Sequence, residues 1–274
     1  DVFVGDRKSA ELRKGTAEAR RNFEKTKPKL IAGFGGYPSY PSLSAARAMG
    51  VPIIIHEQNS VLGRVNRLFA KSAKFVACGF DRLDRLPPGA EATKRVVGNP
   101  VRNAIKAVRE TAYPELSDTG PLNILITGGS QGARLFGEVI PKAIVSLPEA
   151  QRARLNVVQQ AREEQLEAVR DAYAQAGIKA TVESFFSNMQ ERLAAAHLVI
   201  ARSGAGTVTE LAIAGRPSIL IPLGIAMDDH QTANAEGMVT GAAADVVPEP
   251  VFTVETFAPL LLERISNAGV LRAR

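Results

Sequence analysis

Short apolar runs alternate with helix-length amphipathic segments along most of the chain. The first series of apolar runs predicts strands at 30–32, 52–55, 75–78 and 94–97, with a helix from Pro41 to Gly50. A second series begins at Asn123 and predicts strands near 123–127, 155–159, 180–184, 198–201, 218–222 and 244–247. Short apolar strands separated by helices are typical of parallel sheets that are covered on both faces. The pattern therefore predicts an α/β protein in which the second series forms a doubly wound parallel sheet.

The periodicity stops between about residues 104 and 121, where Pro114, Gly120 and Pro121 occur. A chain of 274 residues is long enough for two domains, since a domain usually has ~100–200 residues. We therefore predict an N-terminal domain over 1–104, a linker over 105–120 and a C-terminal domain over 121–274.

A polar, glycine-rich turn follows the predicted strand 198–201. Ser203 to Gly206 are small enough for close backbone approach, and a helix should begin there with its free N–H groups facing a ligand. Such a helix end suits a phosphate or diphosphate. Glu210, one turn further on, could accept hydrogen bonds from a ribose diol. This indicates a nucleotide, although glycines after a strand and a Glu on a helix are also ordinary features of α/β proteins.

A second glycine-rich turn, Gly128-Gly129-Ser130-Gln131-Gly132, follows the strand 123–127. Its Gly-x-Ser-x-Gly spacing matches the nucleophile elbow of an α/β-hydrolase, but no HGGG-type loop precedes it. A dinucleotide fingerprint would need an acidic residue where the next strand ends in Gln159-Gln160. A turn that faces a diphosphate, with Ser130 as a hydroxyl donor, fits better than either.

The net charge of +6 is concentrated near the N-terminus. Residues 7–29 include nine basic side chains: Arg7, Lys8, Arg13, Lys14, Arg20, Arg21, Lys25, Lys27 and Lys29. Leu12, Ala19 and Phe23 give this segment only a narrow apolar stripe. It is either a solvated helix face or a patch for a polyanion, and without interleaved aromatic residues an anionic lipid surface is favoured over nucleic acid.

Several function classes have no support in the composition. Cys78 is the single cysteine, so the chain has no intramolecular disulfide, and His56, His197 and His230 lack partners at metal-ligand spacing. No apolar run approaches the ~18–20 residues that span a bilayer. We expect neither a metal nor a cofactor. Because the chain starts at Asp1 without a methionine, we expect a fragment.

Motifs in the same order along nearly the whole chain resemble the MurG family of peptidoglycan N-acetylglucosaminyltransferases. They are His-Glu-Gln-Asn at 56–59, Gly-Asn-Pro-Val-Arg at 98–102, Gly-Gly-Ser-Gln-Gly-Ala at 128–133, Arg-Ser-Gly-Ala at 202–205 and His-Gln-x-x-Asn at 230–234. The resemblance implies a GT-B-like fold, in which two Rossmann-like doubly wound domains face a cleft, with the first domain incomplete here. It also implies transfer of N-acetylglucosamine from UDP-N-acetylglucosamine to a lipid-linked muramyl-pentapeptide, at the cytoplasmic face of the bacterial inner membrane.

The same resemblance implies roles for individual residues. Ser130 and the turn Ala205, Gly206 and Thr207 would meet the diphosphate, and Glu210 would hold the ribose hydroxyls. Val208 and Thr209 would also belong to the substrate-binding residues. Gln231 would contact the sugar with His230 beside it, Asn59 would reach the donor from the first domain, and Arg102 would lie on the nucleotide side. Phe186 would offer backbone groups to the uracil, whereas we expect Phe185 to pack in the core. We expect His56 to be structural, and His197, where family members more often carry Asp, to have no catalytic role.

The sequence departs from the family at several positions. Gly206 replaces a usual leucine, and Gln159-Gln160-Ala161-Arg162 replaces His-Gln-Thr-Gly. The loop Gly-Gly-Thr-Gly-Gly-His, which would carry the catalytic base, is not among these residues, so the base is unassigned. We therefore expect this chain to bind UDP without transferring the sugar until that loop is restored. The alternatives are a non-catalytic sugar-nucleotide-binding protein and a UDP-sugar epimerase of related fold.

Overall fold

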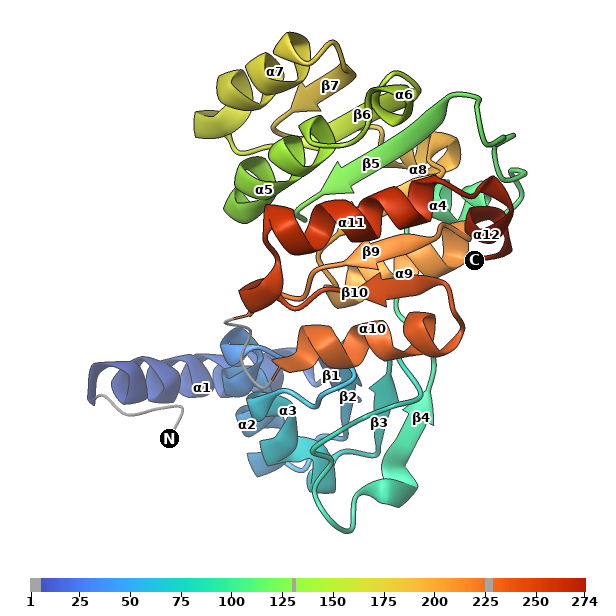
Figure 1. The fold of residues 1–274 in the computed structure, drawn as a ribbon. Helices are drawn as coiled ribbons and strands as arrows, with labels where there is room; N and C mark the ends of the chain where they lie inside the picture. Colours follow the sequence, from blue (N-terminus) through green and yellow to red (C-terminus); the bar gives the residue numbers. More distant parts are fainter. Residues whose placement is uncertain (1–5, 130–131, 225–228) are drawn as a thin grey trace. The chain divides into compact units, whose positions relative to one another are not determined.

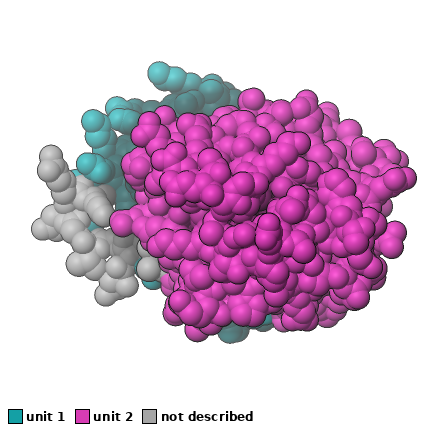
Figure 2. All heavy atoms as spheres, turned by 45° about the horizontal axis from the view of Figure 1, so that its top comes forward, with its two compact units in different colours: residues 1–100 teal, residues 101–274 magenta. Residues whose placement is uncertain are grey.

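The computed structural model describes residues 6–129, 132–224 and 229–274. The chain divides into two compact units, residues 1–100 and 101–274, which Figure 2 colours separately and which we describe one at a time. In the described part of the chain, no helix combines the length and the apolar content that a membrane span requires.

The first unit is a parallel sheet with helices packed against it (Figure 1). Its strands lie in the order β1-β2-β3-β4. Its core holds Leu43, Ile55, Phe69 and Val76, all fully buried. The elements are α1 (Asp6–Thr26), β1 (Ile31–Gly33), α2 (Tyr40–Ala48), β2 (Ile53–Glu57), α3 (Arg64–Phe69), β3 (Phe75–Cys78) and β4 (Lys94–Val96).

Helix α1 carries the basic segment. Leu12 is buried, and Ala19 and Phe23 are partly buried, as the narrow apolar stripe predicts. A Cβ atom added at Gly15 would lie 3.2 Å from Pro41 Cγ, so glycine allows α1 to pack closely on α2. The basic side chains Arg13, Lys14, Arg20 and Arg21 are exposed.

The second unit is a larger parallel sheet with strand order β10-β9-β8-β5-β6-β7. Helices α5, α7 and α11 contribute to one apolar core, while α4, α8 and α9 contact one another apart from that core (Figure 1). The strands are β5 (Leu122–Thr127), β6 (Leu155–Gln160), β7 (Lys179–Glu183), β8 (Leu198–Ala201), β9 (Ser218–Leu220) and β10 (Ala244–Val246). The helices are α4 (Asn103–Val108), α5 (Arg134–Val145), α6 (Glu149–Arg152), α7 (Leu166–Gln175), α8 (Met189–Ala195), α9 (Ala205–Ala214), α10 (His230–Thr240), α11 (Val254–Ile265) and α12 (Ala268–Ala273).

Every predicted strand is present, with bounds shifted by no more than two residues. The predicted linker differs more, because helix α4 occupies its first residues. Ile105 and Val108 lie one turn apart and are buried, and α4 packs on α8 and α9. The contacts therefore divide the chain after Pro100 and not after residue 104.

The strand order places a topological switch point between β5 and β8, which are neighbours in the sheet but not in sequence. From β5 the chain passes through α5 to β6, whereas from β8 it passes through α9 to β9 on the other side. Connections that diverge in this way leave a crevice at the carboxyl ends of the strands, where open α/β sheets bind ligands.

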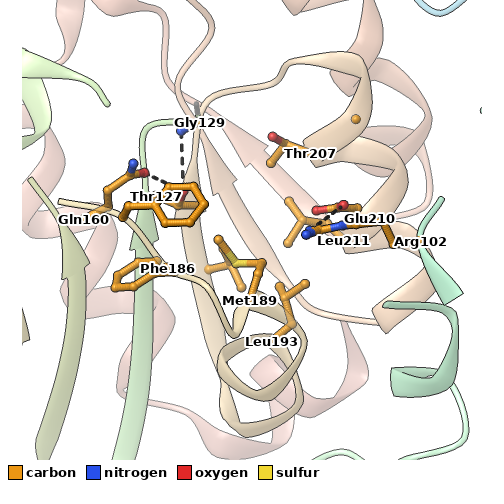
Figure 3. Close-up of a pocket in the computed structure, with 13 residues that line it drawn as sticks. Arg102, Thr127, Gly129, Gln160, Phe186, Met189, Leu193, Thr207, Glu210 and Leu211 are labelled. Carbon is orange, nitrogen blue, oxygen red and sulfur yellow. Dashed lines mark hydrogen bonds and ion pairs between the residues drawn. The ribbon is translucent and has the colours of Figure 1, made fainter. Parts of the chain in front are cut away.

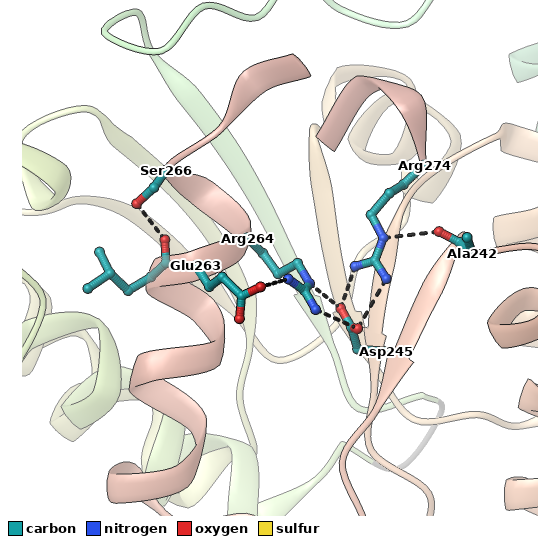
Figure 4. A network of polar contacts seen from close by, with 7 residues as sticks. Ala242, Asp245, Glu263, Arg264, Ser266 and Arg274 are labelled. Atoms are coloured by element: carbon teal, nitrogen blue, oxygen red, sulfur yellow. Dashed lines mark hydrogen bonds and ion pairs between the residues drawn. The ribbon is translucent and has the colours of Figure 1, made fainter. Parts of the chain in front are cut away.

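An arginine-carboxylate network joins the edge strand β10 to the C-terminal helices (Figure 4). Arg264 Nε donates to Asp245 Oδ2 at 2.7 Å, and Arg274 Nη2 donates to Asp245 Oδ1 at 3.1 Å. Burial tends to raise the pKa of Asp245, but the hydrogen bonds from Arg264 and Arg274 outweigh it and lower the pKa from 3.8 to about 2. The carboxylate is therefore more stable in the folded chain than in the unfolded chain.

We predict that Asp245 stabilises the fold above pH 4 and that this contribution disappears as the pH falls toward 2. The unfolded state takes up the proton first, so the free energy of unfolding falls with pH in this window by an amount on the order of 2 kcal/mol. Denaturant titrations of the parent and Asp245→Asn at pH 7 and pH 2.5 measure it. The variant should be less stable at pH 7 and should approach the parent at pH 2.5. A constant difference at both values would contradict the assignment.

Candidate functional site

Two adjoining cavities lie at the switch point of the second unit. Arg102, Thr127, Phe186 and Glu210 are among the residues that line the first cavity (Figure 3). The second is lined by Gly128, Gly132, Arg134, Arg162, Arg202, Gln231 and Glu249, among others. Both cavities share Gly129, Gly206 and Thr207. The pair therefore forms one extended site, with Glu210 at one end and Gln231 at the other.

The N-terminus of α9 lies where the two cavities meet. Gly204 is its N-cap, and Val208 N donates to Gly204 O at 3.0 Å to close the first turn. The N–H groups of the first turn have no intrahelical acceptor and carry the positive end of the helix dipole. Gly206 and Thr207 line the site, whereas the side chains of Ala205 and Val208 are buried and Thr209 Oγ1 donates to Ala205 O. Backbone groups of α9 thus dominate this part of the site.

Glu210 faces the first cavity from the second turn of α9. Its side chain is 25% exposed, and Arg102 Nη2 donates to Glu210 Oε1 at 3.3 Å (Figure 3). Arg102, just before α4, is 63% exposed. The structure brings together these two residues, which are 108 positions apart in sequence.

The turn after β5 is fixed by a residue that sequence reasoning did not identify. Gln160, at the end of β6, accepts hydrogen bonds from Thr127 Oγ1 at 2.9 Å and Gly128 N at 3.1 Å. Its Nε2 donates to Ser184 O at 3.1 Å, which links the turn to the segment before Phe186. The sequence feature that could have identified Gln160 is the presence of a polar residue at the carboxyl end of a buried strand. The predicted diphosphate ligand Ser130 lies outside the described residues.

The two phenylalanines after β7 lie in different environments. Phe185 was expected in the core, but its side chain is 69% exposed and it lines the first cavity, so this prediction is wrong. Phe186 is 5% exposed, and Arg192 lies over its ring at 5.5 Å. Beyond the last buried position of β7, Val182, the chain turns and strand alternation no longer decides which side chain points inward.

Helix α10 supplies the other end of the site. Its first residues are His230 and Gln231, which follow Asp229 in a left-handed conformation with φ 49°. Gln231 lines the second cavity, and its Oε1 accepts a hydrogen bond from Leu223 N at 3.0 Å. Asn234 is buried and donates to Ser203 O at 3.1 Å, which ties α10 to the turn before α9.

In the first unit, the loop after β2 is organised around the buried carboxylate of Glu57. It accepts hydrogen bonds from Asn59 N at 3.1 Å, Gly63 N at 2.8 Å and Asn66 Nδ2 at 2.8 Å. His56 Nε2 lies 3.1 Å from Gly98 O, which accords with a structural role. Asn59, predicted to contact the donor, belongs to this loop, and its side chain donates to Glu57 Oε1 at 3.2 Å.

His197 directly precedes β8, a central strand, and therefore lies at the amino ends of the strands, opposite the crevice. Its Nδ1 accepts from Asn123 N at 2.8 Å, and its Nε2 lies 3.1 Å from Glu115 O. Burial lowers the pKa of His197, so the ring is neutral at pH 7. Because His197 precedes β8 and the Gly128 turn follows β5, it cannot complete a hydrolase triad with that turn. These contacts support the prediction that His197 has no catalytic role.

Comparisons with known proteins agree with these features. The glycosyltransferase family 28 C-terminal domain matches residues 123–272, and the corresponding N-terminal domain matches residues 7–78. The UDP-N-acetylglucosamine--N-acetylmuramyl-(pentapeptide) pyrophosphoryl-undecaprenol N-acetylglucosamine transferase of Maricaulis maris is 52% identical over 98% of this chain and 73% of its own length.

Solved structures give the same result. The crystal structure of Acinetobacter baumannii MurG is 35% identical, with a TM-score of 0.77 over 96% of this chain and 73% of that chain. A UDP-GlcNAc 2-epimerase from Neisseria meningitidis has a TM-score of 0.62 over 96% of this chain and 75% of its own, but at 13% identity it shows only that the fold is shared. The predicted GT-B-like class of fold is confirmed. The chain therefore belongs to glycosyltransferase family 28 and, within it, to the MurG family of UDP-N-acetylglucosamine-dependent N-acetylglucosamine transferases.

Proposed function

We propose that this chain binds UDP-N-acetylglucosamine in the extended site of its second unit and serves the inverting transfer of N-acetylglucosamine to a lipid-linked muramyl-pentapeptide. The observation that supports this most directly is the joining of two cavities at the N-terminus of α9. A sugar nucleotide has a diphosphate between two hydroxyl-rich ends. The site has the matching order, with free N–H groups between a carboxylate and an amide.

The first cavity is the proposed uridine site. Glu210 would accept hydrogen bonds from both ribose hydroxyls, which a carboxylate can do with its two oxygens. The backbone of Phe186 would pair with the edge of the uracil, and the exposed ring of Phe185 offers a face against which the base can stack. Arg102 would remain beside Glu210 and would orient its carboxylate toward the ribose.

The diphosphate would lie at the shared wall formed by Gly129, Gly206 and Thr207. As the bond between the sugar and UDP breaks, negative charge develops on the diphosphate. The N–H groups at the start of α9 are already oriented toward that position, so they can stabilise the leaving group without reorganising. The acceptor hydroxyl would attack the anomeric carbon from the opposite face, which inverts its configuration.

The sugar would lie in the second cavity, where the amide of Gln231 can donate to its hydroxyls and His230 lies beside it. Residues 1–100 are the proposed acceptor and membrane-facing part, with Asn59 reaching the donor, and residues 101–274 are the proposed donor-binding part. The protein would act as a peripheral protein on the cytoplasmic face of the bacterial inner membrane, without a nucleic-acid partner.

We predict that charge reversal on α1 abolishes binding to anionic vesicles. Each basic residue near such a surface contributes ~1 kcal/mol, and Arg13, Lys14, Arg20 and Arg21 are all exposed. The variant with all four residues replaced by Glu should no longer sediment with phosphatidylglycerol vesicles. Binding of the parent protein to these vesicles should weaken as the salt concentration rises. The matched control reverses four exposed basic residues of the second unit, Lys106, Arg109, Lys142 and Lys179. Equal loss in both variants, or no response to either change, would contradict a membrane-facing α1.

The proposed reaction is tested with UDP-N-acetylglucosamine labelled in the sugar, with and without a lipid I analogue. We would compare the 274-residue chain with the same chain extended by the N-terminal segment of the Maricaulis maris relative. Acceptor-dependent release of UDP and a new β-linked disaccharide from the extended chain are expected, together with UDP binding by both. Acceptor-independent conversion of the sugar would instead identify an epimerase. UDP binding without turnover by either chain would identify a non-catalytic binding protein.

A further inference from the structure

Arg134, Arg162 and Arg202 line the second cavity. Among the described residues, these three guanidinium groups differ in how closely a carboxylate approaches them. Arg202 Nη1 donates to Glu249 Oε2 at 2.6 Å, and Arg134 Nε donates to Glu138 Oε1 at 2.7 Å. Arg162 Nη1 lies 3.9 Å from Glu164 Oε1, which is too far for a hydrogen bond. Two of these guanidinium groups are thus held by carboxylates of the same cavity, while that of Arg162 is not.

The stem of Arg162 packs over the glycine turn after β5. A Cβ atom added at Gly132 would lie 3.2 Å from Arg162 Cγ. Arg162 Nε is enclosed and has no hydrogen-bond acceptor among the described residues, whereas the side chain as a whole is 39% exposed. The position of the stem is therefore fixed, and the terminal part of the guanidinium can still reach the cavity.

An anion in the second cavity would supply hydrogen-bond acceptors for the guanidinium group of Arg162. A guanidinium has five N–H donors in a planar fork that matches phosphate oxygens. The same turn also lies before the N-terminus of α5, whose first residue is Arg134, so backbone N–H groups and the positive helix end face the same region. Arg134 itself is engaged with Glu138, so Arg162 is the better placed side chain to add a positive charge.

We propose that Arg162 binds the diphosphate of a substrate in the second cavity. The inference rests on the proposed function, since it assumes that a diphosphate compound occupies this site. In sequence, Arg162 follows Gln160, which holds the turn, and precedes the short 3-10 helix Glu163–Gln165. Gln165 Nε2 donates to Arg134 O at 3.0 Å, which attaches this segment to the start of α5. The guanidinium is thereby positioned by the same contacts that hold the turn.

The test uses calorimetry on the full chain with uridine, UMP, UDP and geranyl diphosphate. Arg162→Gln removes the charge, Arg162→Lys keeps it, and Arg272→Gln is a matched control because Arg272 is exposed and lines neither cavity. If Arg162 holds the donor diphosphate, Arg162→Gln should weaken UDP binding by about tenfold, as expected for a lost charge-assisted hydrogen bond. Uridine binding should not change, and Arg162→Lys should recover part of the loss.

The other outcomes are equally decisive. A loss confined to geranyl diphosphate would keep the diphosphate role but assign it to the lipid-linked acceptor. Unchanged binding of both diphosphates by Arg162→Gln, while the parent binds UDP, would overturn the inference and leave the proposed function intact. If the parent binds neither diphosphate compound, the proposed function fails and the inference fails with it. Thermal unfolding of each variant separates these results from loss of the fold.

Discussion

Replacement of Glu210 with alanine should weaken binding of UDP and of UDP-N-acetylglucosamine by the same amount, about 1.5–3 kcal/mol. The carboxylate lines the first cavity and is three-quarters buried, so its hydrogen bonds to a ribose would be shielded from water. Both ligands contain the same ribose, which is why the two losses should agree. Calorimetry with each nucleotide measures them.

The contribution of the ribose hydroxyls to binding can be measured separately by comparing UDP with 2′-deoxy-UDP. The parent should prefer UDP to 2′-deoxy-UDP, and Glu210→Ala should remove most of that preference because the deoxy compound lacks one of the two hydroxyls. Glu110→Ala, at an exposed carboxylate that lines neither cavity, should leave all affinities unchanged. If Glu210→Ala binds UDP as tightly as the parent, Glu210 does not hold the ribose.

Replacement of Gly128 with alanine should destabilise the second unit by about 2–4 kcal/mol or displace the turn that follows β5. A Cβ atom at this position would lie 2.2 Å from Ala133 N and 2.7 Å from Gly132 C. Both neighbours are backbone atoms, so no side chain can rotate to make room. The displaced turn would also lose its contact with Gln160, and UDP binding should fall with it.

The control for Gly128→Ala is Gly206→Ala, which adds the same methyl group beside the same cavities. Apart from its chain neighbours and the backbone of α9 itself, no atom of the described residues lies within 4 Å of a Cβ placed at Gly206, which is in the first turn of α9. Alanine favours a helix over glycine by roughly 0.5–1 kcal/mol, so this variant should be at least as stable as the parent. Chemical denaturation of both variants measures the contrast. Equal stability of the two variants would contradict the close backbone contacts described at Gly128.

The arrangement of the second unit was predictable because its apolar runs are short, buried and separated by helix-length segments. Strand β8 is buried at every position from Leu198 to Ala201, and the small residues after it leave the chain free to begin α9 at Ala205. The carboxyl ends of β5 and β8 meet in the sheet, so Glu210 and the Gly128 turn had to lie near one site.

Other features depend on contacts between distant residues that no local pattern reveals. Gln160 holds the turn after β5 because β6 pairs with β5, and the sequence alone showed only an unusual amide in place of an acidic residue. Glu57 similarly organises its loop through Asn66, nine residues away. Phe185 was misplaced because apolarity alone cannot distinguish a core ring from one that lines a cavity. Helix α4 was missed because its six residues are too few to show a clear period.

The most direct measurement of the central claim is a crystal structure of this chain with UDP-N-acetylglucosamine. The uridine should lie in the first cavity with its ribose hydroxyls within hydrogen-bond distance of Glu210, the diphosphate should contact the backbone at Gly206 and Thr207, and the sugar should contact Gln231. Density for the nucleotide elsewhere on the second unit, or a reversed orientation with uracil beside Gln231, would contradict the account.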